Sequence, residues 1–266
     1  WLPYRLGTHG EAAALMGRER QVGFDIETTD EVVAGVFYPH RQRCLGYSVA
    51  AHPHGADARC NERCVAFYVP GVPSREVADK LRARDPVKVC HNAKFELTVL
   101  RNHGIELAGY EDTKIAAALL GYQATGLKSL SLEVLGLKQM TLDEVRRGRR
   151  TEEVTAEEWV PYAAADADMT LRLWRGFEPR LADEGLTPLY REFELPLVPV
   201  LADAERRGVL LDVGPLAELG ARLRRKREAI AGHLERWFPG VNLNSYAQLR
   251  EVVFGTHAGW KAVSVG

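Results

Sequence analysis

Apolar and polar positions along the first half of the chain follow the periods of strands and helices in turn. The alternation predicts strands over residues 21–28, 44–51 and 64–70, which would form a meander, and a short buried strand over 86–90. Helical spacing predicts helices over residues 11–17, 74–84, 94–102, 113–120 and 128–135. Strands and helices that alternate in this way are typical of an α/β domain.

The second half of the chain has a mainly helical pattern. Residues 136–156 are polar without a clear period, and we expect a mobile loop there. Thr155 and Glu158 have the spacing of a capping box, so a long helix should begin there and run to about residue 181, bent or restarted near Pro161. After residue 185 we expect a short strand over 208–212 and helices over 189–207, 215–237 and 246–254.

The composition is that of an ordinary globular protein. Of the 266 residues, 46% are hydrophobic and 27% charged, which allows a sizeable core without disulfide bonds. No apolar run reaches the roughly 18–20 residues of a membrane span, and no secretory signal is visible. We therefore expect a cytoplasmic protein that is neither secreted nor membrane-bound. The first residue is Trp rather than Met, which suggests a piece of a longer protein.

A net charge of −1 argues against a passive nucleic-acid coat, but not against an enzyme that binds phosphates through metal ions. Two arginine-rich clusters, residues 146–150 and 222–227, could contact a phosphate backbone. The alternative for both clusters is a solvated surface.

Four cysteines without a signal sequence indicate free thiols in a reducing compartment. His52, His54, Cys60 and Cys64 have side chains that bind zinc, although their spacing matches no common zinc module. A polar hairpin loop with incidental thiols is the alternative.

Two acidic side chains share one face of the first long strand. Asp25 and Glu27 are two residues apart, so both project to the same side of the sheet. Two buried carboxylates on one face are costly unless a cation neutralises them, and Mg²⁺ and Mn²⁺ prefer such oxygen ligands. The alternatives are a strand end with both acids in water, or acids that cap a neighbouring helix.

Two further motifs place polar side chains near this strand. Asn92 and Glu96 lie where a short strand passes into a helix, at the mouth of an α/β sheet where ligands commonly bind. Tyr162 and Asp166 are four residues apart on the long helix and share one face, whereas Asp168 points elsewhere. The three alanines between the tyrosine and the first aspartate allow this helix to approach its neighbour closely.

Together these motifs resemble the DEDDy exonucleases of the ribonuclease H-like superfold. The resemblance rests on their order, D-x-E, then N-x-x-x-acid, then Y-x-x-x-D, and on their context of strand, strand-to-helix turn and helix. It implies a mixed sheet flanked by helices. It also implies two divalent metal ions, Mg²⁺ or Mn²⁺, about 4 Å apart, which clamp the scissile phosphate.

The resemblance implies a role for each matching residue. Asp25, Glu27 and Asp166 would hold the metal ion on the side of the nucleophile. Asp25 would bridge to the second ion, whose outer shell would include Glu96. Tyr162 would hydrogen-bond to the attacking water and orient it.

Three positions complete the comparison. Thr28 and Asn92 match family positions that grip the terminal nucleotide. Glu96 departs from the family pattern, which has Asp there, so its carboxylate lies one methylene farther from the backbone. Displacements on the order of 1 Å can cost about 10²-fold in rate. We expect reduced or metal-selective activity rather than an inactive site.

The last part of the chain resembles the opening of the polymerase module in family A, or DNA polymerase I-type, DNA polymerases. Residues 190–201 and 205–212 carry this resemblance, and residues 242–254 resemble the tip of the thumb. We therefore expect an exonuclease domain over 1–185 and the N-terminal part of the polymerase module, a truncated helical thumb segment, over 186–266. The polymerase active site would lie outside this chain.

The expected function is proofreading: a 3′–5′ exonuclease that releases nucleoside monophosphates from single-stranded or frayed 3′ DNA ends. Expected partners are that DNA end and the rest of the polymerase polypeptide, with the chain as a monomer. Two alternatives stay open. One is a ribonuclease D-like RNA 3′-exonuclease, and the other is a weakened exonuclease fold that acts as a DNA-binding scaffold.

Overall fold

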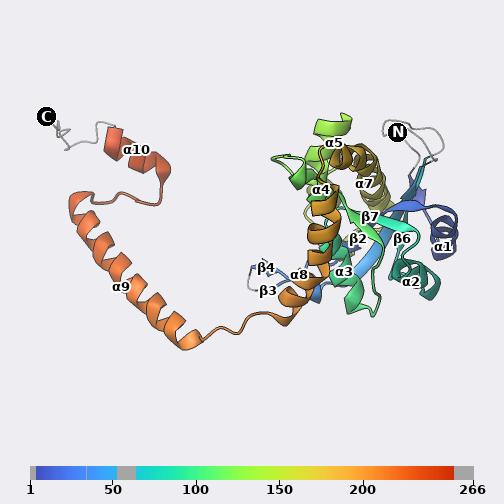
Figure 1. Ribbon diagram of the computed structural model, residues 1–266. Helices are drawn as coiled ribbons and strands as arrows, with labels where there is room; N and C mark the ends of the chain where they lie inside the picture. The colour runs from blue at the N-terminus through green and yellow to red at the C-terminus, as the bar shows by residue number, and fades with distance from the viewer. Residues whose placement is uncertain (1–3, 34, 53–63, 255–266) are drawn as a thin grey trace. The chain divides into compact units, whose positions relative to one another are not determined.

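The computed structural model describes residues 4–33, 35–52 and 64–254. The chain divides into two compact units, Trp1–Gly208 and Val209–Gly266 (Figure 1). The first, here called the sheet unit, contains the β-sheet and the candidate site. The second, called the helical unit, consists of helices and their connections as far as the structure describes it.

A mixed sheet forms the centre of the sheet unit (Figure 1). The neighbours β2, β5 and β6 pair antiparallel, which confirms the expected meander, whereas β1, β7 and β8 join the sheet through parallel pairs. A separate ribbon of β3 and β4 was not expected, because strands of two residues are too short to show a period. In sheet order the strands are β1 (Arg5–Leu6), β6 (Val65–Pro70), β5 (Cys44–Ala51), β2 (Gln21–Thr28), β7 (Val87–Cys90) and β8 (Tyr110–Asp112), and the ribbon is β3 (Val32–Val33) with β4 (Val36–Phe37).

Helices cover both faces of this sheet. On one face α1, α2 and α3 share a core with the even-numbered apolar residues of β2, Val22 to Ile26. On the other face α4, α5 and α7 share a core with Val89 of β7, and α7 crosses β6, β5 and β2. These helices are α1 (His9–Arg18), α2 (Arg75–Arg82), α3 (Ala93–Asn102), α4 (Thr113–Leu119), α5 (Leu127–Leu135) and α7 (Ala156–Asp183).

α7 approaches β2 closely because both elements are small where they meet. A Cβ atom added at Gly23 would lie 2.1 Å from the carbonyl oxygen of Ala167. Ala164 and Ala167 form a small core with Ala50 and Ala66 of the neighbouring strands. The alanine-rich stretch of α7 therefore does allow the close approach that was expected. It faces the side of β2 that carries the odd-numbered residues.

The polar segment 136–156, expected as a mobile loop, contains regular structure. It includes α6 (Leu142–Arg146), which begins with a capping box, and a following 3₁₀ turn. Val145 and Val154 are buried in one cluster with Trp159 of α7. The expectation of an irregular loop was wrong because α6 is too short to show a helical period, while two isolated valines anchor the segment.

α7 begins at the capping box predicted from Thr155 and Glu158 and continues through Pro161 without a restart. After α7 ends, a π-helical turn over Leu189–Glu194 leads directly into α8 (Leu195–Arg207). The helix expected over 189–207 is therefore present, with a wider first turn than the pattern indicated.

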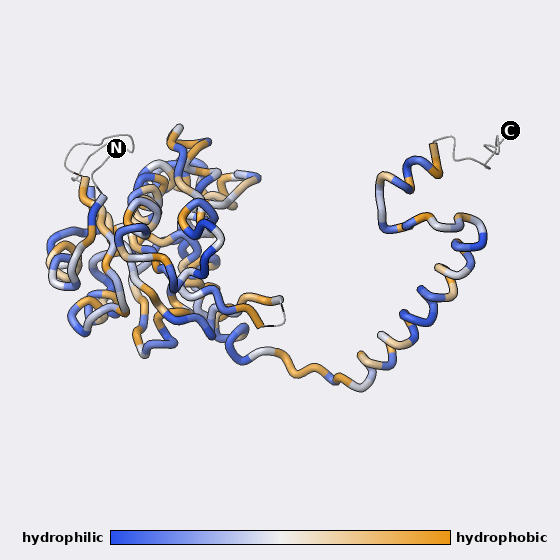
Figure 2. Tube along the Cα trace, turned by 180° about the vertical axis from the view of Figure 1, so that it is seen from behind, coloured by the Kyte–Doolittle hydropathy of each residue, from blue (hydrophilic) through white to orange (hydrophobic). Residues whose placement is uncertain are grey.

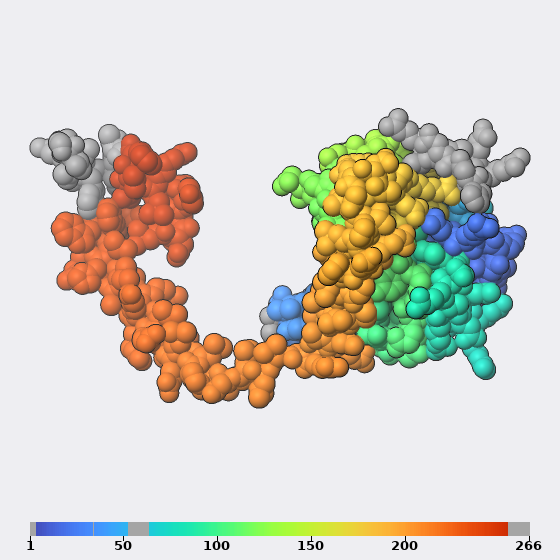
Figure 3. Space-filling model, in the orientation of Figure 1, coloured from blue at the N-terminus to red at the C-terminus, as the bar shows by residue number. Residues whose placement is uncertain are grey.

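The sheet unit extends beyond residue 185. α8, orange in Figure 3, packs against α3. Its residues Val198 and Ala202 are buried in the core. Tyr190 is fully buried, and its hydroxyl accepts a hydrogen bond from the backbone N–H of Asp112 at 2.7 Å. The compact unit therefore ends at Gly208. The assignment of 186–266 to a polymerase module stays a prediction.

The helical unit contains α9 (Val213–Trp237) and α10 (Tyr246–Phe254), which bury no side chain within the described residues. The prediction of a strand over 208–212 is wrong for the described chain. This apolar stretch, visible after α8 in Figure 2, pairs with none of the strands that the structure describes, and Leu210 is 99% exposed. None of the helices in the described part of the chain is long and apolar enough to cross a membrane.

Candidate active site

β2 and α7 bring three carboxylates together. Asp25 and Glu27 lie on the face of β2 against which α7 packs, and Asp166 lies on α7 itself. One oxygen atom from each of these side chains lies within 4.8 Å of the others. The structure therefore gathers the three acids that the sequence predicted would share a metal ion.

The chemistry of these three acids suits a divalent cation. Burial raises the pKa of Asp25 and Glu27 well above the ordinary values, and the neighbouring carboxylates raise both further. Oε1 of Glu27 is buried and has no hydrogen-bond partner among the described residues. Buried carboxylates that repel one another are stabilised by a cation that prefers oxygen ligands, as Mg²⁺ and Mn²⁺ do. The residues therefore fit the metal ions that the resemblance implies.

Glu96 lines the same pocket but lies outside the group of three. Its Oε2 atom is buried without a hydrogen-bond partner in the part of the chain that is described. Burial, and next the charge of Asp25, raise the pKa of Glu96 well above its ordinary value. This position suits an outer contact to a second metal ion, and that role stays a prediction.

Tyr162 lies one turn before Asp166 on α7 and lines the pocket of the acids. Its ring meets Trp159 edge-on, with ring centroids 5.8 Å apart. Burial and the charge of Asp166 raise the pKa of Tyr162, so its hydroxyl stays protonated. This hydroxyl hydrogen-bonds to Asp166, which holds it beside the acids.

Two side chains that the sequence did not single out bind Asp166. Lys128 of α5 forms an ion pair with Oδ1 of Asp166, and Nε2 of Gln139 donates to the same oxygen at 2.9 Å. The Lys128 ammonium also lies 4.0 Å from the centroid of the Tyr162 ring. A lysine near the start of a predicted helix and a glutamine in a polar segment are too common to be recognised as site residues from sequence.

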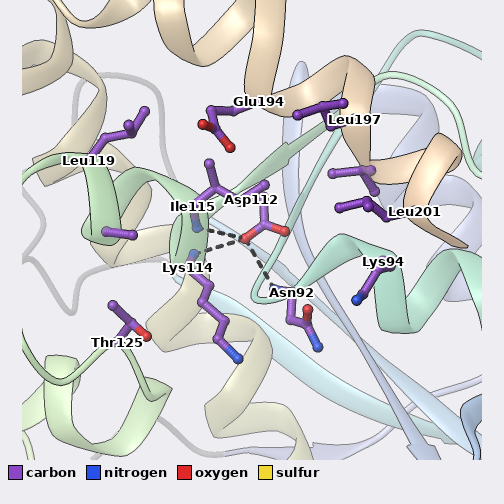
Figure 4. A pocket seen from close by; sticks show the side chains of 12 residues that line it. Asn92, Lys94, Asp112, Lys114, Ile115, Leu119, Thr125, Glu194, Leu197 and Leu201 are labelled. Atoms are coloured by element: carbon purple, nitrogen blue, oxygen red, sulfur yellow. Dashed lines mark hydrogen bonds between the residues drawn. The ribbon is translucent and has the colours of Figure 1, made fainter. Parts of the chain in front are cut away.

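The two residues expected to grip a nucleotide lie in different pockets. Thr28, at the end of β2, lines the pocket of the acids. Asn92 lines a second pocket of about 400 Å³ (Figure 4). Asn92 joins β7 to α3 in the left-handed conformation, with φ of 88°, which asparagine tolerates better than most residues.

Asp112 fixes the turn that carries Asn92 (Figure 4). Its carboxylate accepts a hydrogen bond from the backbone N–H of Ala93 at 2.7 Å, and another from the backbone N–H of Lys114 at 2.9 Å. One side chain thus caps α4 and holds the start of α3. Asp112 was not among the expected site residues, although an aspartate directly before a helix is a common N-cap signal.

The second pocket is lined by two lysines, by the acids Asp112 and Glu194, and by an apolar wall (Figure 4). Lys94 and Lys114 supply the positive charges, and Leu197 and Leu201 of α8 supply the apolar wall. Lys94 also forms an ion pair with Glu205 of α8 at 2.5 Å. The pocket therefore depends on residues beyond 185.

Asp168 belongs to a buried network rather than to the acid cluster. It pairs with Nε2 of His52 and with Nε of Arg172, the latter at 2.9 Å. Asp168 therefore points elsewhere, as the helical spacing predicted. Of the residues named for a zinc site, His54 and Cys60 lie outside the described residues, so that hypothesis stays a prediction.

The arginine-rich cluster over residues 146–150 is engaged in ion pairs. Arg146 contacts Asp30 at 2.6 Å, and Arg149 contacts Glu158 at 2.8 Å. These pairs tie the segment around α6 to the end of β2 and to the start of α7. They favour a structural role for this cluster over contact with a phosphate backbone.

Comparison with known proteins bears on the family of this chain. A family model described as 3′–5′ exonuclease matches residues 59–182. DNA polymerase I of Rhizobium leguminosarum is 32% identical over an alignment of 269 positions that covers 88% of this chain and 25% of that protein. DNA polymerase I of Chloroflexus aurantiacus is 42% identical over 180 residues, which cover 63% of this chain and 19% of that protein. The chain thus spans about a quarter or less of the length of these relatives.

Solved structures support the ribonuclease H-like α/β fold. The POL domain of Pol1 from M. smegmatis, in complex with DNA primer-template and dNTP, has a TM-score of 0.64 at 22% identity, over 94% of this chain and 40% of that one. Brucella melitensis NrnC with bound Mg²⁺ has a TM-score of 0.57 at 23% identity, over 77% of this chain and 92% of that one. The family model and the polymerase relatives together show that this chain contains a 3′–5′ exonuclease domain of the DNA polymerase I type.

Proposed function

We propose that this chain is the proofreading exonuclease of a DNA polymerase I-type enzyme, and that it releases nucleoside monophosphates from single-stranded or frayed 3′ DNA ends. The observation that carries the proposal is the group of carboxylates from Asp25, Glu27 and Asp166, which lie within 4.8 Å of one another. They occur in a chain whose family acts on 3′ ends, and unpaired ends need little sequence discrimination.

Each residue of the pocket has a role in this proposal. Asp25, Glu27 and Asp166 would hold one divalent cation, and Asp25 would also serve a second, with Glu96 in its outer shell. When bound, two such ions activate water and stabilise the leaving 3′ oxygen. Tyr162, which burial keeps protonated, donates a hydrogen bond that orients the attacking water.

The DNA strand in this proposal follows the two pockets. Thr28 and Asn92 hold the terminal nucleotide, one from each pocket. Lys94 and Lys114 attract the phosphate of the preceding nucleotide, while the apolar wall from α8 receives its base. Positively charged grooves that follow the backbone of a single strand bind it with little dependence on sequence.

The test is digestion of a 3′-labelled single strand with Mg²⁺ or Mn²⁺. Asp166→Ala removes a predicted metal ligand. Loss of an outer-shell partner costs about 10–100-fold, and we expect the digestion rate of Asp166→Ala to fall by more than that. Glu133→Ala, which removes an exposed acid of α5, serves as the control and is expected to digest at the wild-type rate. Digestion that survives in Asp166→Ala would contradict the metal assignment.

The two alternatives predict different results in the same assay. A ribonuclease D-like enzyme would degrade an RNA oligonucleotide faster than a DNA oligonucleotide of the same sequence. A DNA-binding scaffold would bind the DNA strand but fail to digest it with either metal ion. We expect DNA to be digested in preference to RNA, because the polymerase-like relatives match residues on both sides of position 185.

A further inference from the structure

Lys128 places a positive charge inside the acid cluster. Its ammonium pairs with Oδ1 of Asp166 and lies 4.0 Å from the centroid of the Tyr162 ring. Burial raises the pKa of Asp25, Glu27 and Asp166, and the Lys128 charge opposes that rise at all three. Lys128 therefore already compensates part of the negative charge that a metal ion would neutralise.

An ammonium and a divalent cation on one carboxylate repel each other strongly, because Coulomb energy grows with the product of the charges and falls with their separation. The Lys128 side chain is 29% exposed, whereas that of Asp166 is 8% exposed. The lysine stem is long and flexible, so its ammonium is able to withdraw toward solvent while Asp166 stays in place.

Gln139 binds the same oxygen of Asp166 without carrying charge. Its Nε2 atom donates at 2.9 Å, and the residue is buried. A neutral donor to a metal-binding carboxylate orients that carboxylate and does not repel the ion. The two donors to Oδ1 should therefore have opposite effects on metal affinity.

We propose that Lys128 is a resident cation of the acid cluster, which a metal ion must displace from Asp166, and that it thereby sets the metal concentration that the site requires. Gln139 is a positioning residue that holds Asp166 when the ammonium withdraws. This inference rests on the proposed metal-dependent function. It adds the residue that controls occupancy of the metal site.

The experiment measures Mn²⁺ binding to the full chain by electron paramagnetic resonance. Lys128→Met removes the competing charge, so we expect Mn²⁺ to bind on the order of tenfold more tightly. Gln139→Leu removes only the orienting donor, so we expect affinity to fall by about 10–100-fold. Lys138→Met, which removes an exposed lysine next to Gln139, is the matched control and should bind as the wild type does.

A second readout guards against a folding defect. In EDTA, Lys128→Met should melt at a lower temperature than the wild type, because a buried carboxylate loses its partner. Added Mn²⁺ should raise its melting temperature more than that of the wild type. Lys128→Arg keeps the charge and should keep the wild-type affinity.

Weaker or unchanged Mn²⁺ binding by Lys128→Met, with a wild type that binds and digests, overturns the inference and leaves the proposed function intact. Lys128 would then support Asp166 as Gln139 does, or have no part in the site. A wild type that neither binds Mn²⁺ nor digests DNA overturns the proposed function, and this inference with it.

Discussion

At the scale of the residue, Glu96 combines three properties that single out its carboxylate. It is buried, one of its oxygens has no hydrogen-bond partner within the described chain, and the charge of Asp25 opposes its ionisation. The resemblance to DEDDy exonucleases implies an aspartate at this position, so the extra methylene of Glu96 places its carboxylate farther from the backbone. A displacement on the order of 1 Å is large enough to affect the rate of a positioned reaction.

Shortening this side chain should therefore accelerate digestion. We expect Glu96→Asp to raise kcat on a 3′-labelled single strand by about tenfold. This gain is smaller than the about 10²-fold that a misplaced reacting group can cost. Titration with Mg²⁺ and Mn²⁺ measures whether the gain depends on the ion. A variant that is no faster with either ion would show that the length of this side chain does not limit the reaction.

The raised pKa of Glu96 also predicts how stability depends on pH. Because the pKa is higher in the folded chain than the about 4.3 of an unfolded chain, the folded state holds the proton more tightly. Protonated Glu96 therefore stabilises the folded chain below about pH 4, and this stabilisation is lost as pH rises through the pKa of the folded chain. Glu96→Gln cannot ionise and escapes this loss. In EDTA, the melting temperature of Glu96→Gln should rise relative to the wild type from pH 4 to pH 8. A constant difference would contradict the raised pKa.

Sequence spacing was sufficient to group some residues of the site but not others. Asp25 and Glu27 share a face because a strand repeats every two residues, and Asp166 follows from helical spacing. Lys128 and Gln139 reach Asp166 only because α5 and the segment before α6 pack beside α7. Such packing between elements leaves no periodic signal in the sequence.

At the scale of the element, the contact between β2 and α7 holds the acids together. Gly23 lies under Ala167 with no room for a side chain, and Leu171 lies next along the helix. Moving α7 outward would separate Asp166 from the acids of β2. The close approach of these two elements is therefore a condition for the site as well as for the core.

A methyl group at Gly23 should disturb both stability and function. Its Cβ would meet the backbone oxygen of Ala167 at 2.1 Å, so α7 must shift. We expect Gly23→Ala to lower the free energy of unfolding by about 1–3 kcal/mol, as overpacked cores do, and to weaken Mn²⁺ binding. Urea denaturation measures the first effect. Gly232→Ala is the control, because nothing lies within 4 Å of its added Cβ, and in a helix it should stabilise by up to about 1 kcal/mol.

Long elements with caps were predictable, and short or unpartnered ones were not. The capping box at Thr155 and the helical period after it located α7. Strands such as β1 have too few residues for a period. The apolar stretch 208–212 has the composition of a strand, but a strand forms only where another strand supplies hydrogen bonds, and within the described chain none does.

At the scale of the whole molecule, the sheet unit and the resemblance-based domain boundary differ. Residues 186–208 carry the polymerase-like pattern, yet Tyr190 and Val198 are buried in the cores of the sheet unit. The apolar wall of the second pocket also comes from α8. The segment is therefore a structural part of the sheet unit.

Truncation separates these two boundaries. A chain that ends at residue 208 should melt close to the temperature at which the sheet unit of the full chain melts. A chain that ends at residue 185 loses Tyr190, Val198 and Ala202 from the cores and should melt about 10 °C lower. Circular dichroism measures both. Equal melting temperatures would show that α8 contributes little to the stability of the sheet unit.

α7 also limits how the length of this protein is able to vary in evolution. Tyr162 and Asp166 point toward the pocket from successive turns, while Asp168 points into a separate network. Each residue inserted or deleted between Tyr162 and Asp168 would rotate the side chains before the change by about 100° relative to those after it. A substitution there alters one side chain, whereas a single insertion would dismantle the pocket or the network. Related sequences should therefore differ in length before Thr155, in the segment around α6, and keep a fixed spacing after it.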